Sequence, residues 1–210
     1  MNAKSRDRGP FRQGEIVVYP AHGVGRVDRV GPEEFSGHRL NAIRVWFADN
    51  QMTLVIPAAR ARAVGLRRLV PPEALDVVIT TLQGYPQASR SMWAKRAQEY
   101  TAKINSGDVI SLSEVVRDLQ HAPDGSGGSF SKRHLFELAM ERLAGEFAAV
   151  SGTSKAAAVV RLTQTLQQAQ DLDAGRAERF SAGVPDGIKK PVRYQFDGRT
   201  HPGSRSSART

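Results

Sequence analysis

The sequence predicts an α+β protein with a β-rich N-terminal region, a helical region and a basic tail. Three observations support this division. Apolar residues alternate with a period of two over residues 14–66, and after Pro71 they recur with the helical period of 3.6. From Gly175 onward, eight basic residues stand against three acidic ones, with no apolar pattern.

Four short runs in the N-terminal region have strand character, at residues 15–19, 26–30, 40–47 and 52–56. Alternation places three residues of the third run on one face: Ile43, Val45 and Phe47. Glycine, asparagine and aspartate between the runs are typical of hairpins, and Pro57 ends the last run because it lacks an N–H. The pattern predicts a small SH3/Tudor-like β-barrel over residues 11–70, after a flexible basic N-terminus at 1–10.

Residues 71–172 predict an all-α helical bundle, with helices near 72–83, 91–104, 111–119, 131–150 and 154–169. Gly107 is expected to end the second helix, and Ser111 and Glu114 match a capping box that would open the third. The Gly/Ser-rich stretch 124–129 is interpreted as a mobile loop. Residues 173–210 are interpreted as a disordered basic tail, which either adds solubility or serves as a nonspecific DNA arm.

The composition argues against several classes of protein. With no cysteine, the chain has no disulfide or thiolate metal site, and its five histidines lack metal-ligand spacing. It also lacks a phosphate-binding glycine loop, a Gly-x-Ser-x-Gly elbow and an apolar run long enough to span a bilayer. We therefore expect no catalytic residues, no metal, no cofactor and no membrane partner. The net charge of +9 favours a polyanionic partner, most commonly nucleic acid.

Two stretches together resemble the CarD family of bacterial RNA polymerase-binding regulators. The first is GEIVVYPAHGVG at 14–25, which is similar to the polymerase-interacting domain shared with transcription-repair coupling factors. The second combines WAKR at 93–96, INSGD at 104–108 and EVVRDL at 114–119. The resemblance implies a Tudor-like barrel that docks on the lobe of the polymerase β subunit. It also implies a helical domain that binds promoter double-stranded DNA just upstream of the melted region, where a tryptophan wedges into the minor groove.

The candidate DNA-binding residues are Trp93, Lys95, Arg96 and Arg90. On periodicity, Trp93 shares a helical stripe with Ala97, Tyr100 and Ile104, which is typical of a core residue. An aromatic residue flanked by cations at a helix start also suits a DNA edge, and the resemblance favours that interpretation. Lys95 and Arg96 would contact phosphates without reading sequence. Arg117 is assigned instead to a structural ion pair with Asp118.

The candidate polymerase-binding residues are Thr53, Leu54 and Val55, on a strand that could offer its edge for pairing. This assignment is carried over from the resemblance. The chain departs from the family where relatives can present basic residues toward polymerase, because Val55 and Glu33 stand at those places. The contact would then be weaker, or would rely on backbone pairing and on other side chains.

The resemblance implies a transcription regulator that stabilises the promoter open complex, and we expect it to be monomeric when bound, cytoplasmic and nucleoid-associated. Stabilising the open complex would raise transcription from promoters at which DNA opening is the slow step. It would lower transcription from promoters at which escape of the polymerase is the slow step. An RNA-binding or ribosome-associated SH3-like module is the alternative, and it would expose several aromatic side chains for base stacking. A protein-only adaptor with incidental positive charge is a third interpretation.

Overall fold

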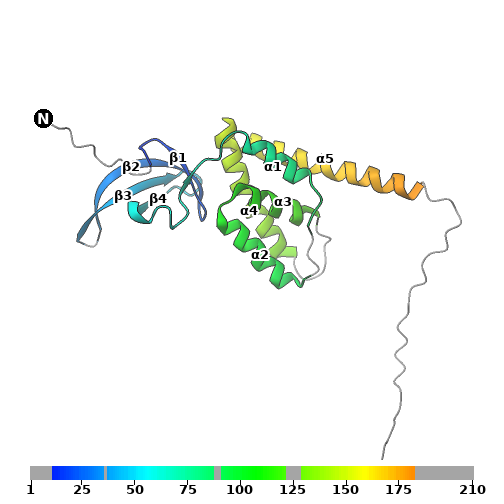
Figure 1. Ribbon diagram of the computed structural model, residues 1–210, viewed down its shortest axis with the longest axis horizontal. Helices are drawn as coiled ribbons and strands as arrows, with labels where there is room; N and C mark the ends of the chain where they lie inside the picture. Colours follow the sequence, from blue (N-terminus) through cyan, green and yellow to red (C-terminus); the bar gives the residue numbers. More distant parts are fainter. Residues whose placement is uncertain (1–10, 36, 88–90, 122–128, 183–210) are drawn as a thin grey trace, which may run out of the picture. The chain divides into compact units, whose positions relative to one another are not determined.

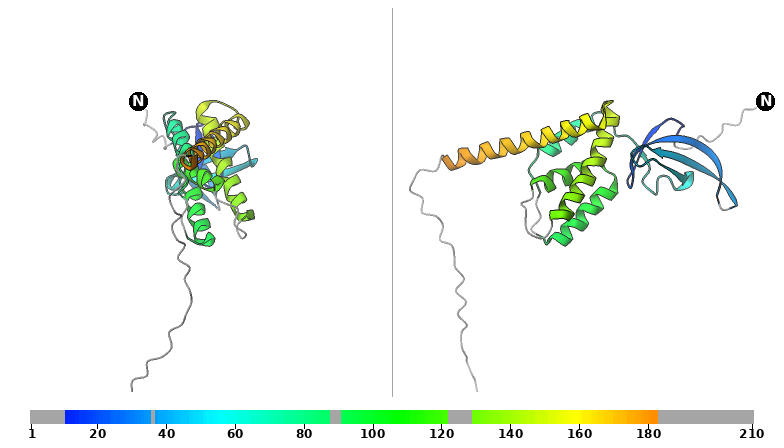
Figure 2. Two further views of the ribbon diagram at one scale, coloured as in Figure 1. Left: turned by 90° about the vertical axis from the view of Figure 1, so that its right-hand side faces the viewer. Right: turned by 180° about the vertical axis from the view of Figure 1, so that it is seen from behind.

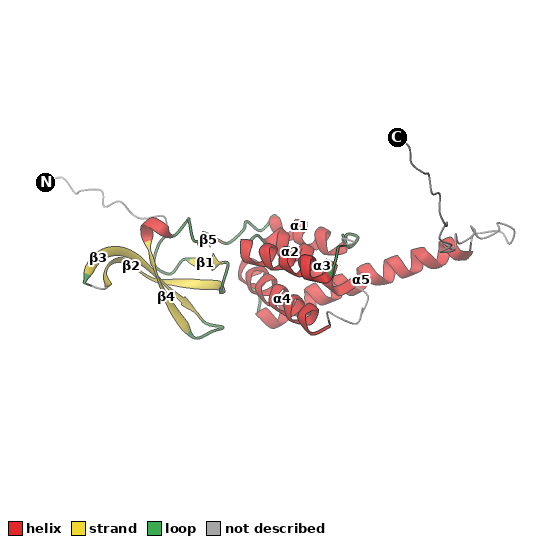
Figure 3. Ribbon diagram, turned by 90° about the horizontal axis from the view of Figure 1, so that it is seen from below, coloured by secondary structure: helices red, strands yellow, loops and turns green. Residues whose placement is uncertain are grey.

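The α+β class is confirmed by a computed structural model of the chain, which describes residues 11–35, 37–87, 91–121 and 129–182 (Figure 1). A five-stranded antiparallel sheet comes first and is followed by five helices within these residues (Figure 3). The chain divides into one unit of residues 1–173 and a second of residues 174–210. The sheet and the helical core both belong to the first unit.

The sheet has the strand order β4-β3-β2-β1-β5, so it follows the chain as a meander until its last strand returns to the first. Its strands are β1 (Ile16–Tyr19), β2 (Gly23–Phe35), β3 (His38–Phe47), β4 (Met52–Pro57) and β5 (Arg67–Arg68). A short 3-10 helix, η1 (Ala58–Arg60), lies between β4 and β5. The predicted alternation on β3 is confirmed, because three of its side chains are fully buried: Ile43, Val45 and Phe47.

Strand β2 is longer than the predicted run at 26–30. It continues through Gly31 and Pro32 and pairs with β3 as far as Phe35. Strand β1 pairs with β2 only from Gly23 to Arg26. The far half of β2 therefore has no second neighbour in the described sheet, and a missing proline N–H is tolerated on such an edge.

Gly25 serves packing and not the tight turn that the sequence suggested. It lies within β2, buried, opposite Val17. A Cβ atom placed on it would come within 2.7–2.9 Å of side-chain atoms of Val45 and Phe47. Any larger residue would therefore force the sheet core apart.

The helices are α1 (Ala74–Gln83), α2 (Trp93–Ser106), α3 (Val109–His121), α4 (Ser129–Ser151) and α5 (Lys155–Ala182). Helix α3 packs against α1 and α4 within the bundle (Figures 1 and 2). The predicted apolar faces make one core, with fully buried side chains from each helix that include Leu82, Ile104, Leu119, Leu143 and Leu162. Gly107 ends α2, as predicted, and it adopts the left-handed conformation there, with φ of 69°.

Two predicted helix boundaries are wrong. Helix α3 begins at Val109, before the predicted capping box, because Asp108 accepts a hydrogen bond from the Ser111 N–H at 2.8 Å. Glu114, the other predicted box residue, pairs with Lys103 at 2.7 Å. Helix α5 continues to Ala182, past its predicted end near residue 169.

The predicted flexible N-terminus, most of the predicted loop at 124–129 and the tail beyond residue 182 lie outside the described residues. Ser129, the last residue of that loop, begins α4. Across the part of the chain that is described, none of the helices is both long and apolar enough to cross a membrane.

Candidate functional sites

Strand β4 lies at an edge of the sheet, and among the described residues it pairs with β3 and with no other strand. Its register sets Thr53 opposite Trp46, Leu54 opposite Val45 and Val55 opposite Arg44. Leu54 packs against the sheet core, whereas Thr53 is exposed and Val55 half-buried on the outer face. The three predicted polymerase-binding residues thus adjoin a free backbone edge, but they do not share one face.

The two positions at which the resemblance implies basic residues, 33 and 55, are connected through Arg44. This arginine is the cross-strand partner of Val55, and its Nη2 atom lies 3.0 Å from Oε1 of Glu33 on β2. The Arg44 guanidinium donates a hydrogen bond from Nε to Oε1 of Glu33, and this bond raises the pKa of the guanidinium. A carboxylate at position 33 therefore partly neutralises the cation that stands beside Val55.

At the start of α2, the predicted DNA-binding residues have different environments. Trp93 is half-buried and packs against the helical core, with its ring centroid 6.5 Å from that of Tyr100 and tilted by 48°. Lys95 is exposed, and Arg96 is half-buried with its guanidinium carbon 5.4 Å from the Trp93 ring centroid. Arg90 lies outside the described residues.

The stripe that made Trp93 a core candidate is confirmed for its later members. Tyr100 and Ile104 are 7% and 1% exposed, and burial raises the pKa of the Tyr100 hydroxyl, aided by the nearby Asp118 carboxylate. Trp93 lies at the rim of this core and is only partly buried. Both the core and the surface interpretations therefore describe part of its environment, and insertion into DNA remains a prediction.

The structural pairing of Arg117 with Asp118 is confirmed. Arg117 Nη2 lies 2.8 Å from Asp118 Oδ1, and both side chains are buried in α3. The same Asp118 oxygen accepts a hydrogen bond from the Gln87 N–H at 2.9 Å. This buried pair thus anchors the segment that leaves α1 and holds one end of the connection toward Trp93.

Sequence reasoning missed the residues that join the sheet to the helices. Arg67 on β5 donates from Nη1 and Nη2 to both carboxylate oxygens of Glu146 on α4, at 2.6 and 2.7 Å. Its Nε donates to the Gly107 carbonyl at the end of α2, at 3.0 Å. The Val70 N–H also donates to Glu146, whose side chain is 1% exposed. We call this group the Arg67–Glu146 junction.

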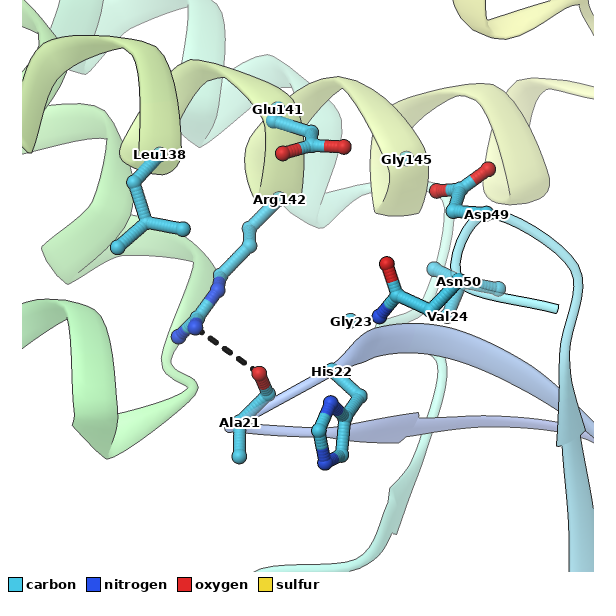
Figure 4. A pocket seen from close by; sticks show the side chains of 10 residues that line it. All are labelled: Ala21, His22, Gly23, Val24, Asp49, Asn50, Leu138, Glu141, Arg142 and Gly145. Carbon is cyan, nitrogen blue, oxygen red and sulfur yellow. Dashed lines mark hydrogen bonds between the residues drawn. The ribbon is translucent and has the colours of Figure 1, made fainter. Parts of the chain in front are cut away.

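A second set of contacts surrounds a cleft of about 100 Å³ that is lined by residues of the sheet and of α4 (Figure 4). Arg142 on α4 donates to the Pro20 and Ala21 carbonyls, and burial lowers the pKa of its guanidinium. Burial would lower the pKa of Lys155 too, but its hydrogen bonds to Asp49 and Glu141 raise it. The charged residues that line this cleft thus serve to hold the sheet against the helices.

Among the described residues, no group of three or more histidine, aspartate or glutamate side chains could hold a metal ion. Comparison with known proteins gives matches on both halves of the chain. A family model described as "CarD-like/TRCF RID domain" matches residues 11–70, and one described as "CarD, C-terminal domain" matches residues 77–163. A Bacillus subtilis (strain 168) protein named "Putative transcription factor YdeB" is 25% identical over 145 residues, covering 69% of this chain and 95% of that protein.

Proposed function

The chain belongs to the CarD family of transcription-related, RNA polymerase-interacting factors, and we propose that it docks on the polymerase β subunit and stabilises the promoter open complex. In this proposal the sheet binds polymerase through β4, and the start of α2 binds double-stranded DNA upstream of the melted region. The observation that carries it is that one chain presents a free strand edge on its polymerase-interacting half and a half-buried tryptophan among cations on its other half.

Support for docking through β4 comes from its free edge. An extended segment of the polymerase could add a strand there and hydrogen-bond to the β4 backbone. Such pairing depends little on side-chain identity, so it tolerates Val55 and Glu33 where relatives can carry basic residues. The flanking side chains Thr53 and Val55 on the outer face would then adjust specificity.

Support for DNA binding comes from the electrostatics of the first turn of α2. Helix N-termini carry partial positive charge, and acidic residues normally compensate it. This turn has no acidic residue, and Lys95 and Arg96 add two cations. The arrangement costs helix stability, but it creates a positive end that favours phosphate. Trp93 and the 82% exposed Met92 stand at the same end, where apolar groups could enter a base step.

The same proposal gives Trp93 its energetic role. An inserted ring offsets part of the unstacking cost of a base step, which is about a few kcal/mol. That energy becomes available only when the DNA is distorted, so it favours the open complex over the closed one. The proposal places the protein in the cytoplasm at the nucleoid and assigns it no catalytic residue.

A second candidate function is binding of single-stranded RNA. Besides Trp93, the described residues expose Trp46 on β3, Tyr85 after α1 and Phe130 on α4, at 41%, 58% and 75%. Several exposed aromatics are what base stacking requires. They lie apart in the chain, however, on β3, after α1 and on α4, and the cations of α2 flank Trp93 in particular. Competition between single-stranded RNA and promoter duplex for the full chain distinguishes the two functions.

The test of the main proposal measures open-complex lifetime with purified polymerase and full-length protein. We expect the protein to co-elute with core polymerase and to lengthen the lifetime of complexes on a promoter that melts unstably. Trp93→Ala should keep the co-elution and remove most of the lengthening. The proposal would be refuted if the protein bound single-stranded RNA more tightly than it binds the polymerase–promoter complex. It would also be refuted if the protein left the open-complex lifetime unchanged.

A further inference from the structure

We propose that Arg96 is a positioning residue that holds the Trp93 indole in place, and that its stack on the indole contributes more to open-complex stability than contact with DNA phosphate does. This inference rests on the proposed function, because it assigns a supporting residue to the same site. Three observations on α2 lead to it: the helical spacing of the two residues, the position of the guanidinium over the ring, and the buried Nε atom of Arg96.

Helical spacing separates Arg96 from its neighbour Lys95. Residues three or four apart on a helix lie on one face, whereas residues two apart do not. Arg96 is three residues after Trp93, and its guanidinium carbon lies 5.4 Å from the ring centroid. Lys95 is two residues after Trp93 and is exposed to solvent. The two cations therefore share a turn of the helix but have different surroundings.

The burial of Arg96 indicates that the stack is its resting state. Its Nε is buried and has no hydrogen-bond partner among the described residues. A guanidinium that served phosphates alone would gain more by extending into water, where every N–H is hydrated. Attraction between the cation and the ring face offsets part of this desolvation. The indole is thus held between the guanidinium and the helical core, against which it also packs.

Holding the indole matters because a wedge must enter a base step in one orientation. A ring that is free to change rotamer loses that freedom on insertion, and the loss weakens binding. A ring already held by Arg96 and by the neighbouring Tyr100 avoids part of this cost. Arg96 would then act through Trp93, and its effect on the open complex should disappear when Trp93 is removed.

A double-mutant cycle in the full-length chain tests this dependence. We expect Arg96→Ala to shorten the open-complex lifetime about three- to fivefold when Trp93 is present, the range that one cation–π contact allows. In the Trp93→Ala background the same change should alter the lifetime less than about 1.5-fold. Lys95→Ala is the matched control, and its effect should be equal in both backgrounds.

Two further measurements separate positioning from charge. Arg96→Lys retains the cation but loses the planar surface, so it should shorten the lifetime nearly as much as Arg96→Ala. In a Trp46→Phe background, where Trp93 is the remaining tryptophan, Arg96→Ala should increase acrylamide quenching of the free protein and Lys95→Ala should not. Thermal melting of each variant identifies any that fails to fold. If Arg96→Ala fails to fold, Arg96→Lys takes its place in the cycle.

The outcomes distinguish this inference from the proposed function. An equal effect of Arg96→Ala in both backgrounds, or full activity of Arg96→Lys, would overturn the positioning role and leave the wedge intact. If Trp93→Ala did not shorten the lifetime, the proposed function and this inference would both fail. Loss of the Arg96 effect in the Trp93→Ala background, together with increased quenching, would establish the positioning role.

Discussion

The edge of β4 and the start of α2 are two candidate contact regions that offer different chemistry. At β4 the groups available to a partner are backbone N–H and C=O groups, because the strand lacks a second neighbour in the described sheet and Leu54 faces the core. At α2 the groups available to a partner are a few side chains, since Trp93 and Lys95 reach solvent from a regular helix. The first region should therefore tolerate substitution, whereas the second should depend on single residues.

This difference explains how the chain departs from its family pattern at one region and keeps it at the other. The resemblance implies basic residues at the positions that Val55 and Glu33 occupy here, and the edge of β4 is open in the described sheet. The motif at 93–96, by contrast, retains the aromatic residue and its cations. A backbone contact survives such changes because every residue except proline supplies an N–H and a C=O.

The largest expected effect concerns the Arg67–Glu146 junction, which joins the sheet to the helices. In Glu146→Gln, an amide group would face the guanidinium of Arg67, and one buried ion pair would be lost. We expect the free energy of unfolding to fall by about 2–4 kcal/mol, since removing one partner of a buried pair is costly. Chemical denaturation followed by circular dichroism measures the loss.

Glu33→Gln is the matched control for the Arg67–Glu146 junction. It breaks an Arg–Glu pair on the outer face of the sheet, in which the Arg44 side chain is 40% and the Glu33 side chain 13% exposed. Exposed pairs contribute about 0–1 kcal/mol, so this variant should unfold almost as the native chain does. Equal losses from the two substitutions would show that the junction does not depend on its buried charge.

The next effect tests whether the α2 region depends on one side chain. Trp93→Ala should shorten the open-complex lifetime about tenfold, which corresponds to about 1.4 kcal/mol. Its half-buried ring also packs on the core, so we expect a stability loss of about 1–3 kcal/mol, below that of a fully buried tryptophan. Open-complex decay and thermal melting of the same preparation give the two quantities.

Phe130→Ala is the control for this experiment. Phe130 is another exposed aromatic of the helical region, and Arg133 lies over its ring at 5.7 Å. Its substitution should leave the open-complex lifetime unchanged, because Phe130 lies on α4 and the proposed DNA contact is at the start of α2. A comparable shortening in both variants would show that general aromatic exposure, and not the position of Trp93, sets the lifetime.

The two halves of the fold were predictable from periodicity because each buries one face. Alternation identified Ile43, Val45 and Phe47, and the 3.6-residue spacing identified Tyr100 and Ile104. Both signals are local, since they depend on residues within one strand or helix. The predicted start of α3 was wrong because the side chains of both Asp108 and Ser111 can cap a helix. Which of the two does so depends on packing, which residue spacing does not reveal.

The candidate site was predictable only in part. The tryptophan and its cations could be read from adjacent residues, but the stack of Arg96 on the ring depends on side-chain rotamers. The Arg67–Glu146 junction gave no sequence signal at all, because its two residues are 79 positions apart. Glu146 occupies a helical position where a charged residue usually faces solvent, and its burial follows from the packing of β5 against α4.

A smaller effect would support backbone pairing at β4. If a polymerase strand adds to this edge, those β4 amides that point away from β3 should become hydrogen-bonded on binding. We expect their hydrogen exchange to slow at least tenfold, while amides already bonded to β3 change little. Exchange measured by mass spectrometry on the full chain, with and without core polymerase, gives this pattern. Uniform exchange across β4 would exclude strand addition.

The smallest effect should come from restoring a cation at Val55. In Val55→Arg the new guanidinium would lie directly across from Arg44, on the same outer face. Like charges opposite each other on a sheet cost about 0.2–1 kcal/mol, although Glu33 lies close enough to Arg44 to screen them. We therefore expect the free energy of unfolding to change by less than about 1 kcal/mol.

Polymerase affinity of Val55→Arg decides between backbone and side-chain contact at β4. A rim charge mainly alters association rate and salt dependence, so a gain of no more than about threefold at physiological salt is expected. Binding measured at two salt concentrations, with Val55→Gln as the uncharged control of similar length, isolates the charge. A gain above about thirtyfold in the arginine variant would mean that side chains dominate at this edge. The contrast with α2 would then be lost, because both regions would depend on single cationic or aromatic residues.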